Sequence, residues 1–256
     1  MIQKFKTAVW FARRPGFWLH GIELFRREFL PNYDVPELRV QATEWARARA
    51  VPLATALQTI EIAGDEQVFP VTLQEEGEQL AAKALVKMGG PGDLDLLYSC
   101  VKLSGAKHVL ETGVAYGWSS LAILAGQSEI EGAKLVSVDM PYPKMDNESF
   151  VGIVVPERFR SKWQLVRQPD RPGVAKAISK LDGQIDLCHY DSDKSWWGRK
   201  YAYPKLWKSL AQGGIFISDD IQDNFGFRDL AEKLGLPFAV TESDGKFVGI
   251  IRKPTE

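Results

Sequence analysis

The sequence predicts an α/β fold built on a mostly parallel sheet with helices on both faces. Between residues 108 and 234, short apolar runs alternate with segments long enough for helices. Strands and helices alternate in this way when right-handed helical crossovers join parallel strands. Two more apolar runs, separated by Ser243, Asp244 and Gly245, predict a hairpin near the end of the chain. We expect a doubly wound, seven-stranded sheet with an antiparallel last strand, preceded by a helical extension.

Each expected element follows from its local pattern of apolar residues, glycines and prolines. Parallel strands are predicted at residues 108–111, 135–139, 163–167, 185–190 and 215–218. Helices are predicted between them at residues 118–127, 173–181, 196–210 and 225–234, and the hairpin strands at 238–241 and 247–251. Upstream, helices are predicted at residues 73–87, where a glycine-rich run ends the pattern, and at 93–104.

The first part of the chain differs from the rest and predicts a helical cap over residues 1–73, followed by a main domain over 74–256. Prolines at positions 15, 31, 36 and 52 divide the cap into short helices. Residues 1–30 hold six Lys or Arg and two acids, interleaved with aromatic residues. Two interpretations stay open: the aromatic residues pack on the main domain or on a second subunit of a homodimer, or the segment contacts a membrane surface.

The composition excludes several classes of protein. The 256 residues are 45% hydrophobic and 25% charged, as in ordinary globular proteins with a sizeable core. A net charge of -1 gives no overall attraction to nucleic acid, so we expect no such partner. Cys100 and Cys188 belong to no metal-binding motif and are predicted to be core residues. We expect a cytoplasmic location, because no cleavable leader and no run of about 18 apolar residues is present.

A glycine loop follows the first predicted strand. Glu111 closes the strand, and residues 113–117 read Gly-Val-Ala-Tyr-Gly before the next helix. Ligands of open α/β sheets bind where such a loop leaves the carboxyl end of a strand. Gly113 would let the backbone approach the ligand closely, and Gly117 would let the helix begin tightly packed. Asp139 ends the next strand, where an acid can accept both hydroxyls of a ribose.

The same loop favours a cationic nucleoside over a dinucleotide. The third glycine of the nicotinamide fingerprint is absent, which disfavours an oxidoreductase. A carboxylate at Glu111 suits a ligand that carries an ammonium and a sulfonium better than one that carries two phosphates.

These motifs resemble those of class I S-adenosylmethionine (SAM)-dependent methyltransferases, which share a Rossmann-like fold. The resemblance covers residues 76–256, with the glycine motif at residues 111–117 and the ribose-binding acid at Asp139. It implies SAM as cofactor, and it implies a set of residues that contact SAM along the first three strand ends. These are Glu111, Gly113, Ala115, Tyr116, Gly117, Ser119, Asp139 and, beside the adenine, Asp170.

Three acids follow two neighbouring predicted strands. Asp191 comes after the fourth strand, and Asp219 and Asp220 come after the fifth. Because parallel strands end at the same edge of a sheet, these carboxylates would crowd together and repel one another. A hard divalent cation such as Mg²⁺ would relieve the repulsion. Without a metal, Asp193 and Lys194 would form a surface ion pair and Asp219 would cap a turn.

This acidic cluster resembles the metal site of catechol and caffeoyl-CoA O-methyltransferases, and that of bacterial sugar and macrolide-glycoside O-methyltransferases. The resemblance implies Asp191, Asp219 and Asp220 as ligands of Mg²⁺ or another divalent cation, although Asp220 stands where the first family has Asn. It also implies Lys194 as the base that takes the proton of a metal-bound hydroxyl. The neighbouring carboxylates would raise the pKa of Lys194 unless a metal neutralises them, so this role depends on the metal.

The sequence therefore predicts a metal-assisted O-methyltransferase for a small hydroxylated acceptor, such as a sugar or a glycosylated metabolite. The long connection over residues 140–162 is expected to contact the acceptor through Tyr142, Met145 and Phe150. His189 lies within an apolar strand and is expected in the core or at its rim, and His20 belongs to no motif. Two alternatives are a metal-independent methyltransferase of the same fold and a non-catalytic membrane-peripheral binding protein.

Overall fold

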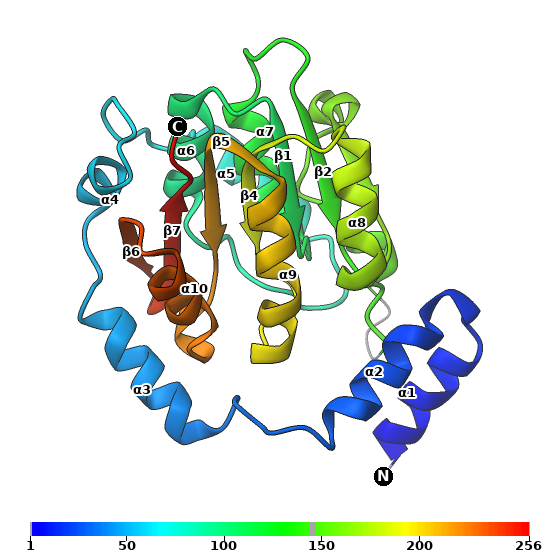
Figure 1. Ribbon diagram of the computed structural model, residues 1–256. Helices are drawn as coiled ribbons and strands as arrows, with labels where there is room; N and C mark the ends of the chain where they lie inside the picture. The colour runs from blue at the N-terminus through cyan, green and yellow to red at the C-terminus, as the bar shows by residue number, and fades with distance from the viewer. Residues whose placement is uncertain (1, 144–146, 256) are drawn as a thin grey trace.

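The computed structural model describes residues 2–143 and 147–255, with side chains from residue 7 onward. A seven-stranded sheet in the order β3-β2-β1-β4-β5-β7-β6 forms its centre (Figure 1). Strands β1 to β5 are parallel, and β7 is antiparallel to both β5 and β6. The predicted sheet and its reversed last strand are confirmed. The strands are β1 His108–Thr112, β2 Lys134–Val138, β3 Trp163–Val166, β4 Ile185–Tyr190, β5 Leu210–Ser218, β6 Phe238–Ser243 and β7 Lys246–Arg252.

Helices precede the sheet and connect its strands. The ten α-helices of the described residues are α1 Ile2–Ala12, α2 Trp18–Arg27, α3 Pro36–Arg47, α4 Leu53–Thr59, α5 Val71–Ala81, α6 Leu94–Ser104, α7 Trp118–Gly126, α8 Asp170–Lys180, α9 Trp196–Ser209 and α10 Gly226–Leu234. Short 3-10 helices, among the residues described, are η1 Pro15–Phe17, η2 Glu148–Phe150, η3 Glu157–Lys162 and η4 Ile221–Asp223.

One predicted helix is shorter than its pattern indicates. The helix expected over residues 73–87 ends at Ala81, and residues 82–86 form turns. Leu85, which lies within the predicted range, is 89% exposed. Because most helical stability comes from burying an apolar face, a stretch whose leucine stays in water does not extend the helix.

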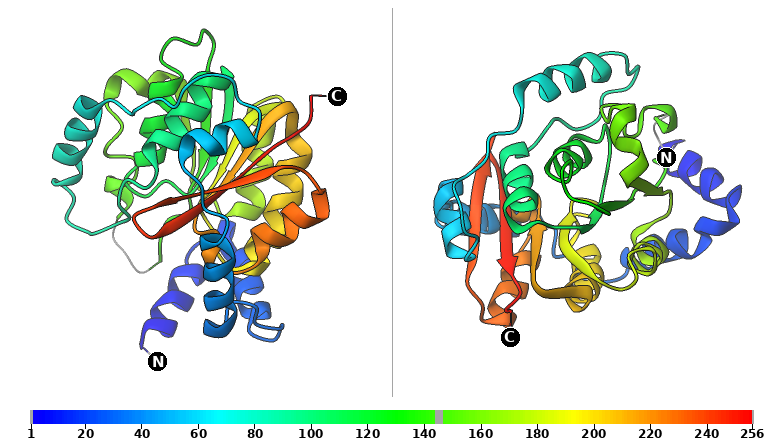
Figure 2. Two further views of the ribbon diagram at one scale, coloured as in Figure 1. Left: turned by 90° about the vertical axis from the view of Figure 1, so that its left-hand side faces the viewer. Right: turned by 90° about the horizontal axis from the view of Figure 1, so that it is seen from above.

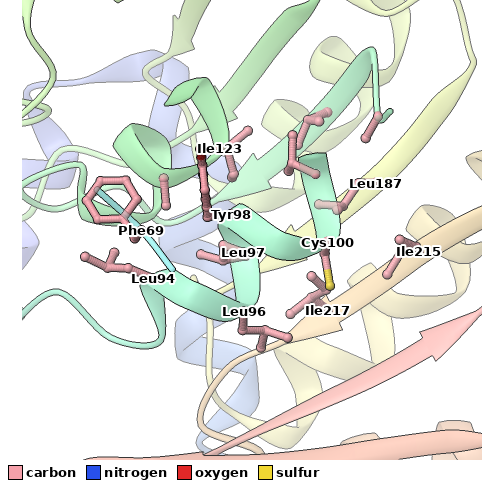
Figure 3. Packing of buried hydrophobic residues seen from close by; sticks show 14 of the residues in the cluster. Phe69, Leu94, Leu96, Leu97, Tyr98, Cys100, Ile123, Leu187, Ile215 and Ile217 are labelled. Carbon is pink, nitrogen blue, oxygen red and sulfur yellow. The ribbon is translucent and has the colours of Figure 1, made fainter. Parts of the chain in front are cut away.

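Alternate residues of the central strands pack on opposite faces of the sheet. Val109, Leu187 and Ile215 face a core that α6 and α7 cover. Figure 3 shows Leu187 and Ile215 in this packing, close to Leu97 and Cys100 of α6. Leu110 and Phe216 face the other core, below α8, α9 and α10. Burial of one such side chain contributes roughly 1.5–3 kcal/mol. Both cysteines, Cys100 and Cys188, are fully buried without a disulfide, as predicted for core residues.

The N-terminal region has two parts: residues of α4 pack on the core, whereas α1 and α2 lie beyond the carboxyl ends of the parallel strands. Leu57 of α4 and Ile60 just after it pack into the core, and the N–H of Val51 donates to the carbonyl of Val240 in β6 at 2.9 Å. Helices α1 and α2 instead stand out from the body beyond the carboxyl ends of the parallel strands (Figures 1 and 2). The predicted boundary between cap and domain at residue 73 stays a prediction.

Candidate active site

A cavity of about 900 Å³ opens at the carboxyl ends of the parallel strands. The loop after β1 lines it, together with Asp139 after β2 and residues 191–194 after β4. Residues of α1 and α2 line its outer side. This is the place where open α/β sheets bind their ligands, and the volume is in the usual range for small-molecule sites.

The two loop glycines adopt backbone conformations that favour glycine. Gly113 has a φ of +81°, and a Cβ atom there would lie 2.3 Å from the carbonyl oxygen of Asp191. Gly117 has a φ of +92°, and its Cβ would lie 2.9 Å from the Cα of Gly152. The predicted close approach at Gly113 is present, but the partner is the chain's own loop after β4. Gly113 therefore joins the β1 loop to the β4 loop, while Gly117 lies behind the cavity lining.

Glu111 lies fully buried behind the glycine loop and does not line the cavity. Its carboxylate accepts hydrogen bonds from the hydroxyls of Ser119, Ser120 and Ser137, each at 2.5 Å. These bonds join the end of β1 to the start of α7 and to β2. Glu111 thus holds the loop from behind, so this placement disfavours the direct contact with a cationic ligand that we predicted. The sequence shows an acid at the strand end but not the three hydroxyls that surround it.

Asp139 lies beside the glycine loop, and its contact with a ribose stays a prediction. Its Oδ1 accepts a hydrogen bond from the N–H of Val114 at 3.0 Å, and its Oδ2 pairs with Arg167. Burial raises the pKa of Asp139, against the opposing effects of Val114 and Arg167. The other predicted contacts of the first two strand ends, Ala115, Tyr116 and Ser119, line the same cavity.

The three acids after β4 and β5 have cationic side chains as partners. The ammonium of Lys194 lies 3.0 Å from Oδ1 of Asp191 and also pairs with Asp220. His189 Nε2 lies 3.2 Å from Oδ1 of Asp219. His189 is fully buried in β4, as expected of a core residue, yet it also partners this acid.

The neighbouring carboxylates raise the pKa of both Lys194 and His189. Burial alone would lower the pKa of Lys194, but the carboxylates of Asp191 and Asp220 outweigh it and raise that pKa. Burial likewise opposes the charged form of His189, but Asp219 and Glu111 raise its pKa to about 10. Lys194 is therefore a protonated group near neutral pH, and the predicted role of Lys194 as a base does not fit this arrangement.

The predicted Mg²⁺ ligands do not form a metal site. Within residues 2–143 and 147–255, no group of three or more His, Cys, Asp or Glu side chains is arranged to hold a metal ion. Asp220 does not line the cavity, and its Oδ1 accepts a hydrogen bond from Gln222 at 3.0 Å. Lys194 lies between Asp191 and Asp220, where it supplies the positive charge that we assigned to a metal. The assignment of Asp191, Asp219 and Asp220 as Mg²⁺ ligands therefore stays a prediction that this arrangement does not support.

Two acids of the cavity titrate close to neutral pH. Burial raises the pKa of Asp170 to about 6, although its carboxylate accepts a hydrogen bond from the hydroxyl of Ser192 at 2.6 Å. Burial and the nearby Asp219 raise the pKa of Asp191 to about 6, against the effect of Lys194. Asp191 and Asp170 both line the cavity, so each can exchange a proton with a bound ligand.

Several residues of the site escaped the sequence analysis. Arg27 of α2 lines the cavity and pairs with Asp193 at 2.7 Å across 166 positions of sequence, a contact that no local pattern reveals. His20 also lines the cavity, and burial lowers its pKa. The fully buried guanidinium of Arg199 donates to the carbonyls of Asp219 and Asp220, at 3.2 and 2.7 Å, and so holds the loop after β5.

The long connection after β2, residues 140–162, contributes one of its predicted acceptor contacts to the lining of the cavity. Tyr142 lines the cavity, as expected for an acceptor contact, whereas Phe150 does not. Met145 lies outside the described residues.

Comparison with known proteins agrees with the fold. Residues 110–221 match a family described as a methyltransferase domain, and this span includes the glycine loop and the acids after β4 and β5. An O-methyltransferase from Bacillus cereus, in complex with SAH, gives a TM-score of 0.52 at 17% identity and covers 81% of this chain and 100% of that chain. An SAH-bound methyltransferase from Podospora anserina gives a TM-score of 0.52 at 15% identity, covering 73% and 90%. No curated protein matches the chain.

The strand order with a reversed last strand defines a Rossmann-like methyltransferase fold, and the cavity lies at its ligand-binding edge. The match of residues 110–221 to a methyltransferase domain agrees with the resemblance seen in the sequence.

Proposed function

We propose that this enzyme binds SAM and transfers its methyl group to a hydroxyl oxygen of a small acceptor without the help of a metal ion. One observation carries the proposal. A single cavity of about 900 Å³ joins the glycine loop and Asp139 to the pair formed by Asp191 and Lys194. One side offers groups for a nucleoside, and the other offers groups that activate a hydroxyl.

The donor side fits SAM by its chemistry. The backbone of residues 113–116 lines the cavity, and Asp139 stands beside it with a carboxylate that can accept ribose hydroxyls. A ribose would take the Oδ2 atom that Arg167 now contacts. Asp170, the next acid along this edge, would lie beside the adenine. When bound, SAM supplies an electrophilic methyl group on a sulfonium.

On the acceptor side, Asp191 and Lys194 have different roles. Asp191, with a pKa of about 6, accepts the proton of the acceptor hydroxyl. The ammonium of Lys194 stabilises the negative charge that develops on the oxygen. The oxygen–methyl bond forms as the sulfur–methyl bond breaks, the sulfonium becomes a neutral thioether, and the proton stays on Asp191. The chain's main contribution is to align the two reactants.

The acceptor class follows from the same groups. A hydroxylated molecule such as a sugar or a glycosylated metabolite would use the charged and polar groups of Asp191, Lys194 and Tyr142, which line the cavity.

Substitution of Lys194 tests its proposed role. In Lys194→Met the developing charge loses its cationic partner, so we expect kcat to fall about 100-fold while the affinity for SAM changes little. The assay measures transfer of a labelled methyl group to a panel of sugars and glycosides. Lys200→Met is the matched control, because Lys200 is exposed and lies over the rings of Trp196 and Trp197 away from the cavity. Equal kcat in wild type and Lys194→Met would contradict the proposed role of Lys194.

A metal-assisted reaction is the alternative, and chelation distinguishes the two. Mg²⁺ at Asp191, Asp219 and Asp220 would have to displace Lys194 and His189 from their carboxylates. We expect turnover to change less than about twofold in excess EDTA, since no proposed step uses a metal. A large loss that Mg²⁺ restores would favour the metal-assisted reaction.

A further inference from the structure

Helix α2 has two faces with different surroundings. His20, Leu24 and Arg27 line the cavity. Trp18, Ile22, Phe25 and, just past the helix, Phe29 follow the spacing that places residues on one side of a helix. These four side chains are exposed, at 52%, 56%, 62% and 74% of their surface.

We call these four residues and Leu19, which is 84% exposed, the α2 outer face. The interpretation that the N-terminal aromatic residues pack on the main domain is wrong for this face, although Phe11 is buried. The rings of Phe25 and Phe29 are in contact, with centroids 5.2 Å apart. Large apolar side chains that gather on one exposed side of a helix are typical of an interaction site.

The charges around the α2 outer face favour an anionic partner. Arg13, Arg14 and Arg26 are exposed. The acid of the helix, Glu23, instead pairs with Arg27 at 2.6 Å and with Arg171 on the protein side. Glu28 also has a partner. With the exposed Glu28 counted, three exposed arginines stand against one acid, so this surface is apolar and net basic, the combination with which helices lie on anionic lipid.

The same charges disfavour a second copy of the chain. Two outer faces packed together would bring the arginines of both copies close to one another, and like charges across an interface oppose association. An anionic bilayer offers acyl chains for the apolar residues and headgroups for the arginines.

We propose that the α1–α2 hairpin docks the protein on anionic lipid surfaces through the α2 outer face. The contact is peripheral, because no helix in the described part of the chain has the length and apolarity needed to cross a bilayer. The hairpin also forms the outer side of the cavity, so docking would bring that side close to the lipid. The inference does not depend on the proposed reaction, because it uses neither the donor loop nor the acids.

Vesicle sedimentation of the full chain tests the proposal. We expect the wild type to sediment with phosphatidylcholine vesicles rich in phosphatidylglycerol, and much less with phosphatidylcholine alone. The double variant Ile22→Ser/Phe25→Ser should bind at least about tenfold more weakly, because two apolar side chains no longer enter the lipid. Arg13→Gln/Arg26→Gln should weaken binding most at low salt. Val68→Ser is the control, since Val68 is 71% exposed outside the hairpin.

Thermal unfolding of each variant checks that it is folded. Absence of binding to both kinds of vesicle would overturn the proposal, as would equal binding by wild type and Ile22→Ser/Phe25→Ser. Light scattering measures the oligomeric state and so tests the alternative, a second copy of the chain. A wild-type dimer that Ile22→Ser/Phe25→Ser abolishes, without any vesicle binding, would assign the α2 outer face to that second copy.

Discussion

The two sides of the cavity are built in different ways. Most of the donor side comes from one stretch of chain, residues 111–139, and its buried carboxylate Glu111 is held by three hydroxyls from the same stretch. The acceptor side is assembled from distant segments, as the ion pair between Arg27 and Asp193 shows, and its acids are balanced by cationic side chains. In the proposed reaction, contacts within one stretch of chain would form most of the donor side, and contacts between distant segments would shape the side that receives the acceptor.

The largest effect is expected at the junction of the two sides. In Gly113→Ala the new methyl group would collide with the carbonyl of Asp191, so we expect the free energy of unfolding to fall by about 4 kcal/mol and binding of SAH to be lost. Gly105→Ala is the matched control: its φ is +66° but its Cβ would meet nothing within 4 Å, so it should cost only about 1–2 kcal/mol. Urea denaturation measures the free energy of unfolding of both variants. Equal losses in Gly113→Ala and Gly105→Ala would argue against the close approach of Gly113 to Asp191.

A smaller effect is expected inside the donor framework. Glu111→Gln weakens the three hydroxyl contacts and removes a buried charge near His189, which should lower the free energy of unfolding by about 3 kcal/mol. The exposed Glu129→Gln should leave stability within about 0.5 kcal/mol of wild type. If Glu111→Gln were as stable as wild type, the carboxylate would not be holding the loop.

Beside the proposed adenine position, pH changes the free energy of unfolding through Asp170. Its pKa is raised from 3.8 to about 6 on folding, so its contribution is complete below pH 3.8 and is lost as the pH rises through 6. We expect Asp170→Asn to avoid this loss and to gain about 2 kcal/mol over wild type between pH 4 and 7. Urea denaturation across this range measures the gain. The exposed Asp182→Asn provides the control, and a constant difference between Asp170→Asn and wild type would contradict the assignment.

Sequence patterns predicted the sheet well because each strand carries its own signal. Leu187 and Cys188 pack on opposite faces, and both faces are covered, so β4 reads as a continuous apolar run. The helix over residues 73–87 was too long, because the pattern does not show whether another element covers Leu85.

The site was predicted only where neighbouring strand ends determine it. Gly113 and Asp139 lie at the cavity because parallel strands end at one edge. The metal site stays a prediction, and the sequence did not reveal that Lys194 pairs with the acids that precede and follow it. Neither that pairing nor the place of His20 on the cavity can be obtained from spacing, since both depend on packing between distant segments.

Calorimetric titration with SAH in the presence of EDTA tests the central claim most directly, because it asks whether the donor side binds its nucleoside without a metal. We predict one SAH per chain for the wild type and at least about tenfold weaker binding for Asp139→Asn, which loses the charged acceptor of the ribose hydroxyls. Asp182→Asn should bind as the wild type does. Absence of SAH binding to the wild type, or equal affinity in Asp139→Asn, would contradict the account.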